Sequence, residues 1–194
     1  MMVSRSQRPH RPHVLGVDDA PFDKKQAHPV PVVGVLMEGN DLVEGVALTD
    51  FPVDGAEATG FLATWIDGLR WRDAMQAVVL GGITMAGLGL VDLEELARQL
   101  TIPVLAVTRR DPGKSRIGEA LEAAGLPDRL PTAQHSPRPI RVTPGLYVAL
   151  AGIEPARATD LVRATLRKSR MPEPLRVAHL IAGAVARGQS RGRV

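Results

Sequence analysis

Two neighbouring carboxylates, Asp18 and Asp19, follow directly on the apolar run of residues 13–17. Open α/β sheets place their sites at the carboxyl ends of central strands, and carboxylate oxygens there suit Mg²⁺ or Mn²⁺. Because successive side chains of a strand point to opposite faces, we expect only one of the pair to face a given cleft. The alternative is a turn that ends the strand, a position where aspartate is also common.

A second acidic pair, Asp54 and Glu57, lies where an amphipathic helix is expected to begin. Asp54 is a good N-cap, and Glu57 three residues later completes a capping arrangement that needs no function. The same carboxylates would also serve as metal ligands or as catalytic groups. The spacing leaves both interpretations open.

His179 lies in an apolar helical run that follows Pro172 and Pro174. An imidazole can ligate a metal, position water or act as a general acid or base. A single histidine on such a helix is also common as a core or surface residue, so the residue type alone does not decide. The other histidines lack a comparable context: His10, His13, His28 and His135.

Two further features suit phosphate. Arg109 follows the apolar run of residues 104–107, and a guanidinium binds phosphate bidentately, although an arginine that merely faces solvent is the alternative. Residues 81–89 are rich in glycine, whose backbone can approach a phosphate or a base closely. They do not form a P-loop, because they lack the closing Gly-Lys-Ser/Thr.

The first elements that must position these residues are three β-like runs, at residues 13–18, 30–38 and 42–49. The turn at residues 39–41 is short enough to demand an antiparallel hairpin. Helix and strand then alternate: helices at residues 56–69 and 93–100, strands at 77–80 and 103–107. Alternation implies parallel pairing through crossovers. We therefore predict an α/β fold whose mixed sheet combines a three-stranded antiparallel meander with parallel strands on the far side of the first strand.

The last third of the chain is expected to add helices around the sheet. We predict a helix at residues 115–124, a proline-rich connector at 126–139, a β-like run at 140–150 and helices at 155–166 and 173–187. With 194 residues the chain suits one domain, at residues 13–189. Residues 1–12 are expected to form a flexible basic arm and residues 190–194 a loose basic tail.

Composition narrows the classes of function. Aromatic residues make up only 3% of the chain, which argues against a base-stacking platform of the single-strand binders. The formal net charge of +3 and the excess of arginine are compatible with a polyanionic partner, or else reflect coding bias. Without cysteine, disulfides and thiolate sites are excluded. No apolar run approaches the roughly 20 residues of a membrane span, and no signal-peptide core is visible, so the cytoplasm is the expected compartment.

The stretch RMPEPLRVAH at residues 170–179 resembles the C-terminal R-L-P-E-P-T-R-x-A-H segment of endonuclease V, the nuclease of deaminated DNA. The run GVDD at residues 16–19 is similar to that family's first strand, which ends in a metal-binding aspartate. With VDG at residues 53–55 and GIT at 82–84, the chain resembles the endonuclease dU family from residue 14 onward. This resemblance implies a ribonuclease H-like, endonuclease V-like fold.

The resemblance also implies a metal-dependent endonuclease that nicks DNA at deoxyuridine or other deaminated bases. Mg²⁺ or Mn²⁺ would be held by Asp18 with Asp19 or Asp54 as helpers, while Glu57 is the nearest counterpart of the family's catalytic glutamate. His179 would orient water, and the loop at residues 81–89 would wall a pocket for the extruded base. Nucleic-acid contacts are expected from Gly82, Thr84, Arg109 and Arg176.

One position departs from the endonuclease V pattern. Where that family has the aspartate of its V-D-G segment, this chain has Gly81, which offers no carboxylate. Another acid must replace it, and Asp19, Asp54 and Asp92 are the candidates. The alternative is a catalytically decayed protein that binds nucleic acid without cleaving it. A third interpretation is a small-molecule enzyme, whose binding would be indifferent to salt.

Overall fold

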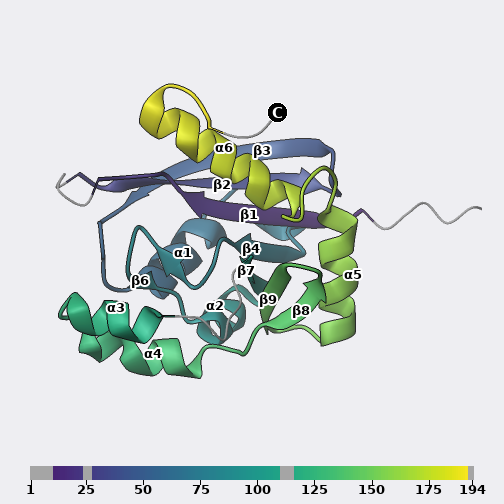
Figure 1. Cartoon of the computed structure of the whole chain (residues 1–194). Coiled ribbons are helices and arrows are strands. Elements are labelled where there is room, and N and C mark those ends of the chain that lie inside the picture. Colours follow the sequence, from purple (N-terminus) through teal and green to yellow (C-terminus); the bar gives the residue numbers. More distant parts are fainter. Residues whose placement is uncertain (1–10, 24–27, 110–115, 192–194) are drawn as a thin grey trace, which may run out of the picture.

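The computed structural model describes residues 11–23, 28–109 and 116–191, and a seven-stranded sheet runs through its centre (Figure 1). The strand order is β3-β2-β1-β4-β7-β9-β8. Strands β1 (His13–Asp19), β2 (Val30–Glu38) and β3 (Leu42–Phe51) form the antiparallel meander. Strands β4 (Ala77–Leu80) and β7 (Val104–Thr108) then add in parallel on the other side of β1. The predicted mixed sheet is therefore confirmed.

The far edge of the sheet differs from the prediction. The single run expected at residues 140–150 is a hairpin of β8 (Ile140–Thr143) and β9 (Leu146–Ala151), and β9 pairs antiparallel with β7. The chain reverses at Gly145, whose φ of 75° lies in the left-handed region that glycine adopts readily. The reversal falls inside an apolar stretch, so hydrophobicity alone did not reveal it.

The proline-rich connector predicted at residues 126–139 is also wrong in part. It contains a 3₁₀ turn, η3 (Pro127–Arg129), and a short helix, α4 (Leu130–His135). In both, a proline occupies one of the first two positions. Proline is tolerated there because the first backbone N–H groups of a helix have no partner to lose.

Helices cover both faces of the sheet, as Figure 1 shows. Helices α1 (Ala58–Asp67) and α2 (Leu93–Leu100) pack on one face, and α5 (Pro155–Thr165) and α6 (Glu173–Arg187) on the other. The remaining helix, α3 (Ile117–Ala123), packs with α4 beside the α1 and α2 layer. Buried aliphatic side chains fill the space between the sheet and the helices on both of its faces. Strand β4 is buried along its whole length, as expected for a central strand covered on both sides.

Some predictions fall partly on residues that lie outside the described part of the chain. These are residues 1–10 of the predicted arm, residue 115 of the helix predicted at 115–124, and residues 192–194 of the predicted tail. The last predicted arm residues are described, and there Arg11 forms ion pairs with Glu38 and Asp41. Within the described residues, no helix is long and apolar enough to cross a membrane.

Candidate active site

A small hollow, here called the Asp18 hollow, opens at the carboxyl ends of β1 and β4. Its wall on one side is the hairpin of β5 (Thr84–Met85) and β6 (Gly89–Leu90), which forms within the glycine-rich segment. The lining residues are Val17, Asp18, Asp19, Leu62, Leu80, Gly81, Gly82, Thr84, Met85 and Val91. Its volume of about 10 Å³ is room for roughly one water molecule or one ion.

Both aspartates line this hollow, which corrects the expectation that only one of them would face a given cleft. Side chains do alternate between faces along β1, but the hollow lies at the end of the strand. A cleft that wraps around a strand terminus is reached from both faces. Asp18 and Asp19 therefore belong to one site.

Helix α6 reaches the hollow because Gly16 lets it approach β1 closely. A β-carbon at Gly16 would lie 2.2 Å from the carbonyl carbon of Pro174 and 2.3 Å from the backbone nitrogen of Leu175. Only glycine permits such a backbone approach. Since Pro174 lies in the first turn of α6, this contact sets where the helix starts on the strand, and His179 follows within the next two turns.

His179 and Asp18 meet as a hydrogen-bonded pair, with Nδ1 of the imidazole 2.7 Å from Oδ2 of the carboxylate. The hydrogen bond that the imidazole donates to Asp18 is the main cause that raises the pKa of His179 above its ordinary value, since the proton is shared with an anion. The carboxylate side chain is 18% exposed, whereas the imidazole is 56% exposed. The pair thus faces solvent through the histidine.

Asp19 has a strongly shifted pKa in the hollow. Burial and then the neighbouring charge of Asp18 raise its pKa to about 6, although the backbone N–H of Ala86 donates a hydrogen bond to its carboxylate. Two adjacent carboxylates in a poorly solvated place repel each other. This is the electrostatic situation that a bound cation relieves, and strongly shifted groups in a cleft mark functional sites more often than chance.

Gly81 lies beside Asp18, so the missing carboxylate of the endonuclease V pattern would have pointed into this same place. A β-carbon at Gly81 would lie 2.8 Å from Oδ1 of Asp18 and 3.9 Å from the side chain of Leu175. Asp18 therefore occupies space that a longer residue at position 81 would share.

Two other acidic residues singled out from the sequence, Asp54 and Asp92, accept hydrogen bonds from backbone N–H groups. Oδ1 of Asp54 accepts a hydrogen bond from the backbone N–H of Leu88 at 2.7 Å, which holds the β5–β6 hairpin against the start of α1. Asp92 is the N-cap of α2, and its side chain accepts a hydrogen bond from the backbone N–H of Glu95. The capping arrangement that was one of the two interpretations for Asp54 and Glu57 does not form. Glu57 is itself the N-cap of α1, in the left-handed region at φ 57°, and its side chain makes no capping hydrogen bond.

Glu57 is exposed and lines a different hollow, of about 530 Å³, at the start of α1. The residues that line this second hollow include three aromatic ones, Phe51, Phe61 and Trp65. Glu57, which the resemblance implies to be the counterpart of a catalytic glutamate, is thus not among the residues that line the Asp18 hollow.

The four predicted nucleic-acid contacts divide into two groups. Gly82 and Thr84 line the Asp18 hollow, and the exposed Arg109 lies near enough to His179 that its charge opposes protonation of the imidazole. The guanidinium of Arg176, in contrast, pairs bidentately with Glu173, at 2.7 Å between Nη2 and Oε2. Because Glu173 is only 3% exposed, this pair supports the start of α6.

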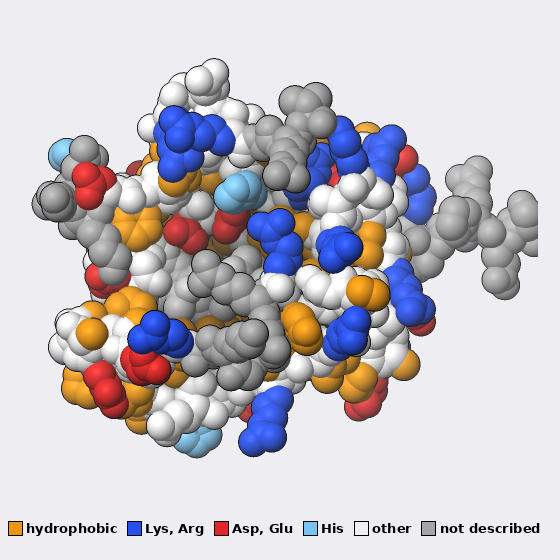
Figure 2. All heavy atoms as spheres, viewed as in Figure 1, with side chains coloured by type: hydrophobic (Ala, Val, Ile, Leu, Met, Phe, Trp, Pro, Cys, Tyr) orange, Lys and Arg blue, Asp and Glu red, His pale blue; other side chains and the backbone are white. Residues whose placement is uncertain are grey.

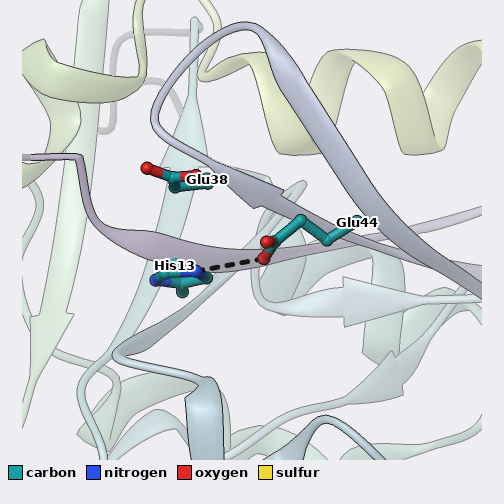
Figure 3. A group of neighbouring side chains, drawn as sticks. All are labelled: His13, Glu38 and Glu44. Carbon is teal, nitrogen blue, oxygen red and sulfur yellow. Dashed lines mark ion pairs between the residues drawn. The ribbon is translucent and has the colours of Figure 1, made fainter.

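One group of potential metal ligands was not found from the sequence. Among the described residues, His13, Glu38 and Glu44 bring one ligand atom each to within 4.8 Å of one another (Figure 3). They come from three different strands, so no sequence spacing signals them. This group and the fold described above are both compatible with a divalent metal.

Comparison with known proteins matches the chain to one family over most of its length. The family model described as Endonuclease dU matches residues 10–186. A "UPF0215 protein" of Methanothermobacter thermautotrophicus is 37% identical over 183 residues, covering 92% of this chain and 90% of the relative. A second, from Archaeoglobus fulgidus, is 34% identical and covers 92% and 96%.

Solved structures confirm the architecture. A crystal structure of a protein of unknown function from Archaeoglobus fulgidus is 33% identical, with a TM-score of 0.82 over 90% of this chain and 98% of that one. Endonuclease V from Streptomyces avermitilis, 21% identical, has a TM-score of 0.56 and covers 91% and 82%. Endonuclease V from Ciona intestinalis, solved with DNA that contains an inosine followed by a ribo-adenosine, is 14% identical with a TM-score of 0.52 and covers 87% and 82%. At these identities the two endonucleases establish the fold alone.

Proposed function

The chain belongs to the endonuclease dU family, and on that premise we propose that it is a metal-dependent endonuclease that nicks DNA at deoxyuridine or other deaminated bases. The observation that carries the proposal is the Asp18–His179 pair at the rim of a hollow lined by a second carboxylate. An exposed imidazole beside a strand-end carboxylate is a suitable acid–base and ligand set for opening a phosphodiester.

The donors of the Asp18 hollow fit Mg²⁺ or Mn²⁺. Mg²⁺ is commonly bound through one or two carboxylates together with water and substrate phosphate, so Asp18 and Asp19 suffice without a third acid at position 81. The raised pKa of Asp19 supports this assignment, because burial and then the neighbouring charge of Asp18 are its causes, and a bound cation would offset both. When bound, the cation would activate water and stabilise the charge that develops on the phosphate.

His179 acts in this proposal as the proton donor. Its raised pKa keeps the ring protonated further toward neutral pH, and a protonated imidazole can donate hydrogen bonds but cannot accept them. It is therefore suited to protonate the sugar oxygen that leaves as water adds to phosphorus and the P–O bond breaks. Asp18 orients the ring and stabilises its positive charge.

The surface around the site favours a polyanion. Figure 2 shows acidic side chains and a histidine beneath α6, with lysine and arginine side chains grouped around them. Arg109 is one of these cationic residues near the site, since its charge acts to lower the pKa of His179. Cations that border an acidic centre can hold the phosphates on either side of the scissile bond.

The base itself does not fit the Asp18 hollow as it stands, since about 10 Å³ is far smaller than a nucleobase. An extruded base requires the β5–β6 hairpin to move outward. That hairpin is only two residues long on each strand, and its displacement would break the hydrogen bonds that tie it to Asp19, Asp54 and Arg129. Base extrusion coupled to hairpin opening would favour lesions that are already poorly paired.

The test is nicking of a uracil-containing duplex in Mg²⁺ or Mn²⁺. Replacement of Asp18 by Ala or His179 by Ala should lower the single-turnover rate by about 100-fold or more. Control duplexes with thymine in place of uracil should stay intact. Glu57→Gln is informative too, since the second hollow is separate from the proposed chemistry and this variant should keep its rate.

Cleavage that survives Asp18→Ala would remove the proposed metal site. Salt-sensitive binding of the duplex without cleavage by the wild-type protein would instead favour a binding protein on a nuclease fold.

A further inference from the structure

The group formed by His13, Glu38 and Glu44, here called the meander triad, lies at the opposite end of β1 from the Asp18 hollow. His13 and Asp18 are five positions apart on one strand, which corresponds to roughly 17 Å. The meander triad is thus a separate feature. In Figure 3, His13 and Glu44 point toward each other from β1 and β3, and Glu38 lies between their strands on β2.

The backbone register explains how three strands deliver ligands to one place. His13 and Glu38 are direct cross-strand partners, so their side chains share a face. On β3, Gly45 pairs with Leu36 and Val43 pairs with Met37, which leaves Glu44 as the extra residue of a β-bulge. A bulge redirects the side chain it carries. Here it turns Glu44 toward the imidazole, with Oε2 lying 3.1 Å from Nε2 of His13.

The geometry points to a binding site for a first-row divalent cation of the Zn²⁺ class in the meander triad. Tetrahedral zinc with ligand distances near 2.1 Å separates neighbouring ligand atoms by roughly 3.4 Å, close to the spacing of His13 and Glu44. The third ligand atom is within 4.8 Å of both, so small side-chain rotations complete the set. The side chains are about one-third exposed, which leaves a path for the ion and for a water ligand.

The donor set decides the class of ion. One imidazole with two carboxylates suits Zn²⁺, Co²⁺ or Mn²⁺, whereas Mg²⁺ prefers oxygen ligands throughout. The local charge agrees, because three carboxylates gather here, those of Glu38, Asp41 and Glu44, and the guanidinium of Arg11 pairs with the first two. A cation there would tie the edge strand β3 to β1 and β2.

The guanidinium of Arg11 would compete with a metal ion for the carboxylate of Glu38. Its Nε lies 3.0 Å from Oε1 of Glu38 and its Nη2 pairs with Asp41. Glu38 retains Oε2 for a metal, but the guanidinium lowers the attraction of that carboxylate for a second cation. Removal of Arg11 should therefore tighten cation binding, which no purely structural role of the triad predicts.

The experiment is calorimetric titration of the full chain with Zn²⁺, in an Asp18→Asn, His179→Gln background that silences the Asp18 hollow. We expect one site, which His13→Gln or Glu44→Gln weakens by at least about tenfold. Arg11→Gln should strengthen it several-fold, and His135→Gln on α4 should change nothing. Co²⁺ in place of Zn²⁺ should show visible absorption that disappears in His13→Gln.

Zn²⁺ binding that persists unchanged in both triad variants, or no binding below millimolar Zn²⁺, would overturn the assignment. In otherwise wild-type protein, His13→Gln and Glu44→Gln should keep their nicking rate in Mg²⁺, so the two sites are tested independently. Zn²⁺ should also raise the melting temperature of the silenced background and not of its His13→Gln derivative.

Discussion

The imidazole of His179 lies 2.7 Å from the carboxylate of Asp18, although 161 positions separate the two residues in the chain. One belongs to the first strand and the other to the last helix. Their contact depends on Gly16, which brings the start of α6 against β1. Each part of this arrangement makes a measurable prediction.

Asp18→Asn should lower the pKa of His179, because the hydrogen bond to an anion is the main cause of its elevation. A histidine whose pKa is raised by folding stabilises the protein below its unfolded value of about 6.5, and this contribution is lost as pH rises through the folded pKa. The histidine signals in a ¹H–¹³C NMR titration report the change. Glu122→Gln, an exposed carboxylate of α3, should leave the curve of His179 unchanged. An unaltered His179 titration in Asp18→Asn would contradict the hydrogen-bonded pair.

Asp19 should titrate near pH 6 in the metal-free protein. Because folding raises its pKa, the folded state holds this proton more tightly, and the stability it contributes falls as pH rises from about 4 through 6. Asp19→Asn keeps an oxygen for the N–H of Ala86, so it should become more stable relative to wild type above pH 6. Carboxyl ¹³C NMR checks the pKa, and added Mg²⁺ should lower it. Titration near 4, or indifference to Mg²⁺, would count against the proposed metal site.

Gly81→Asp should restore a carboxylate beside Oδ1 of Asp18, where a β-carbon would lie 2.8 Å away. Repulsion between the two should destabilise the metal-free protein by about 1–2 kcal/mol. Mn²⁺ should then bind about tenfold more tightly than to wild type, since the added charge acts at short range. Calorimetry and urea unfolding measure both effects. Gly81→Asn has the same size without the charge, and a similar gain in that variant would rule out this explanation.

Gly16→Ala should push α6 away from β1, since the new methyl group would overlap the backbone of Pro174. We expect a loss of about 3 kcal/mol or more in the free energy of unfolding and a loss of nicking. Gly60→Ala is the matched control, because it lies inside α1 with nothing within 4 Å of the added carbon. That change should stabilise the protein by about 0.5–1 kcal/mol. Urea unfolding distinguishes the two, and equal effects would refute the close-approach role of Gly16.

Local patterns explain which elements were predicted well. The bounds of β2, β4, α2 and α6 agree with the predictions residue for residue, because hydrophobic period and bounding turn residues act within a few positions. The β8–β9 hairpin was missed because its turn lies within an apolar run. Helix α4 was missed because a proline usually breaks a helix, whereas Pro131 lies in the first turn of α4, where proline is tolerated.

The sequence by itself determined the family, the mixed sheet and the acidic end of β1, because each can be predicted from short motifs, hydrophobic periods and turn residues along the chain. The family resemblance had implied that Asp18 and His179 share one site. Only the tertiary structure decided the contact between the two side chains and the place of Glu57 at another hollow. It also decided that a bulge turns Glu44 toward His13. The physical reason is that such contacts depend on strand register and on backbone approach at single glycines. These are set by the packing of the whole chain, which no local spacing encodes.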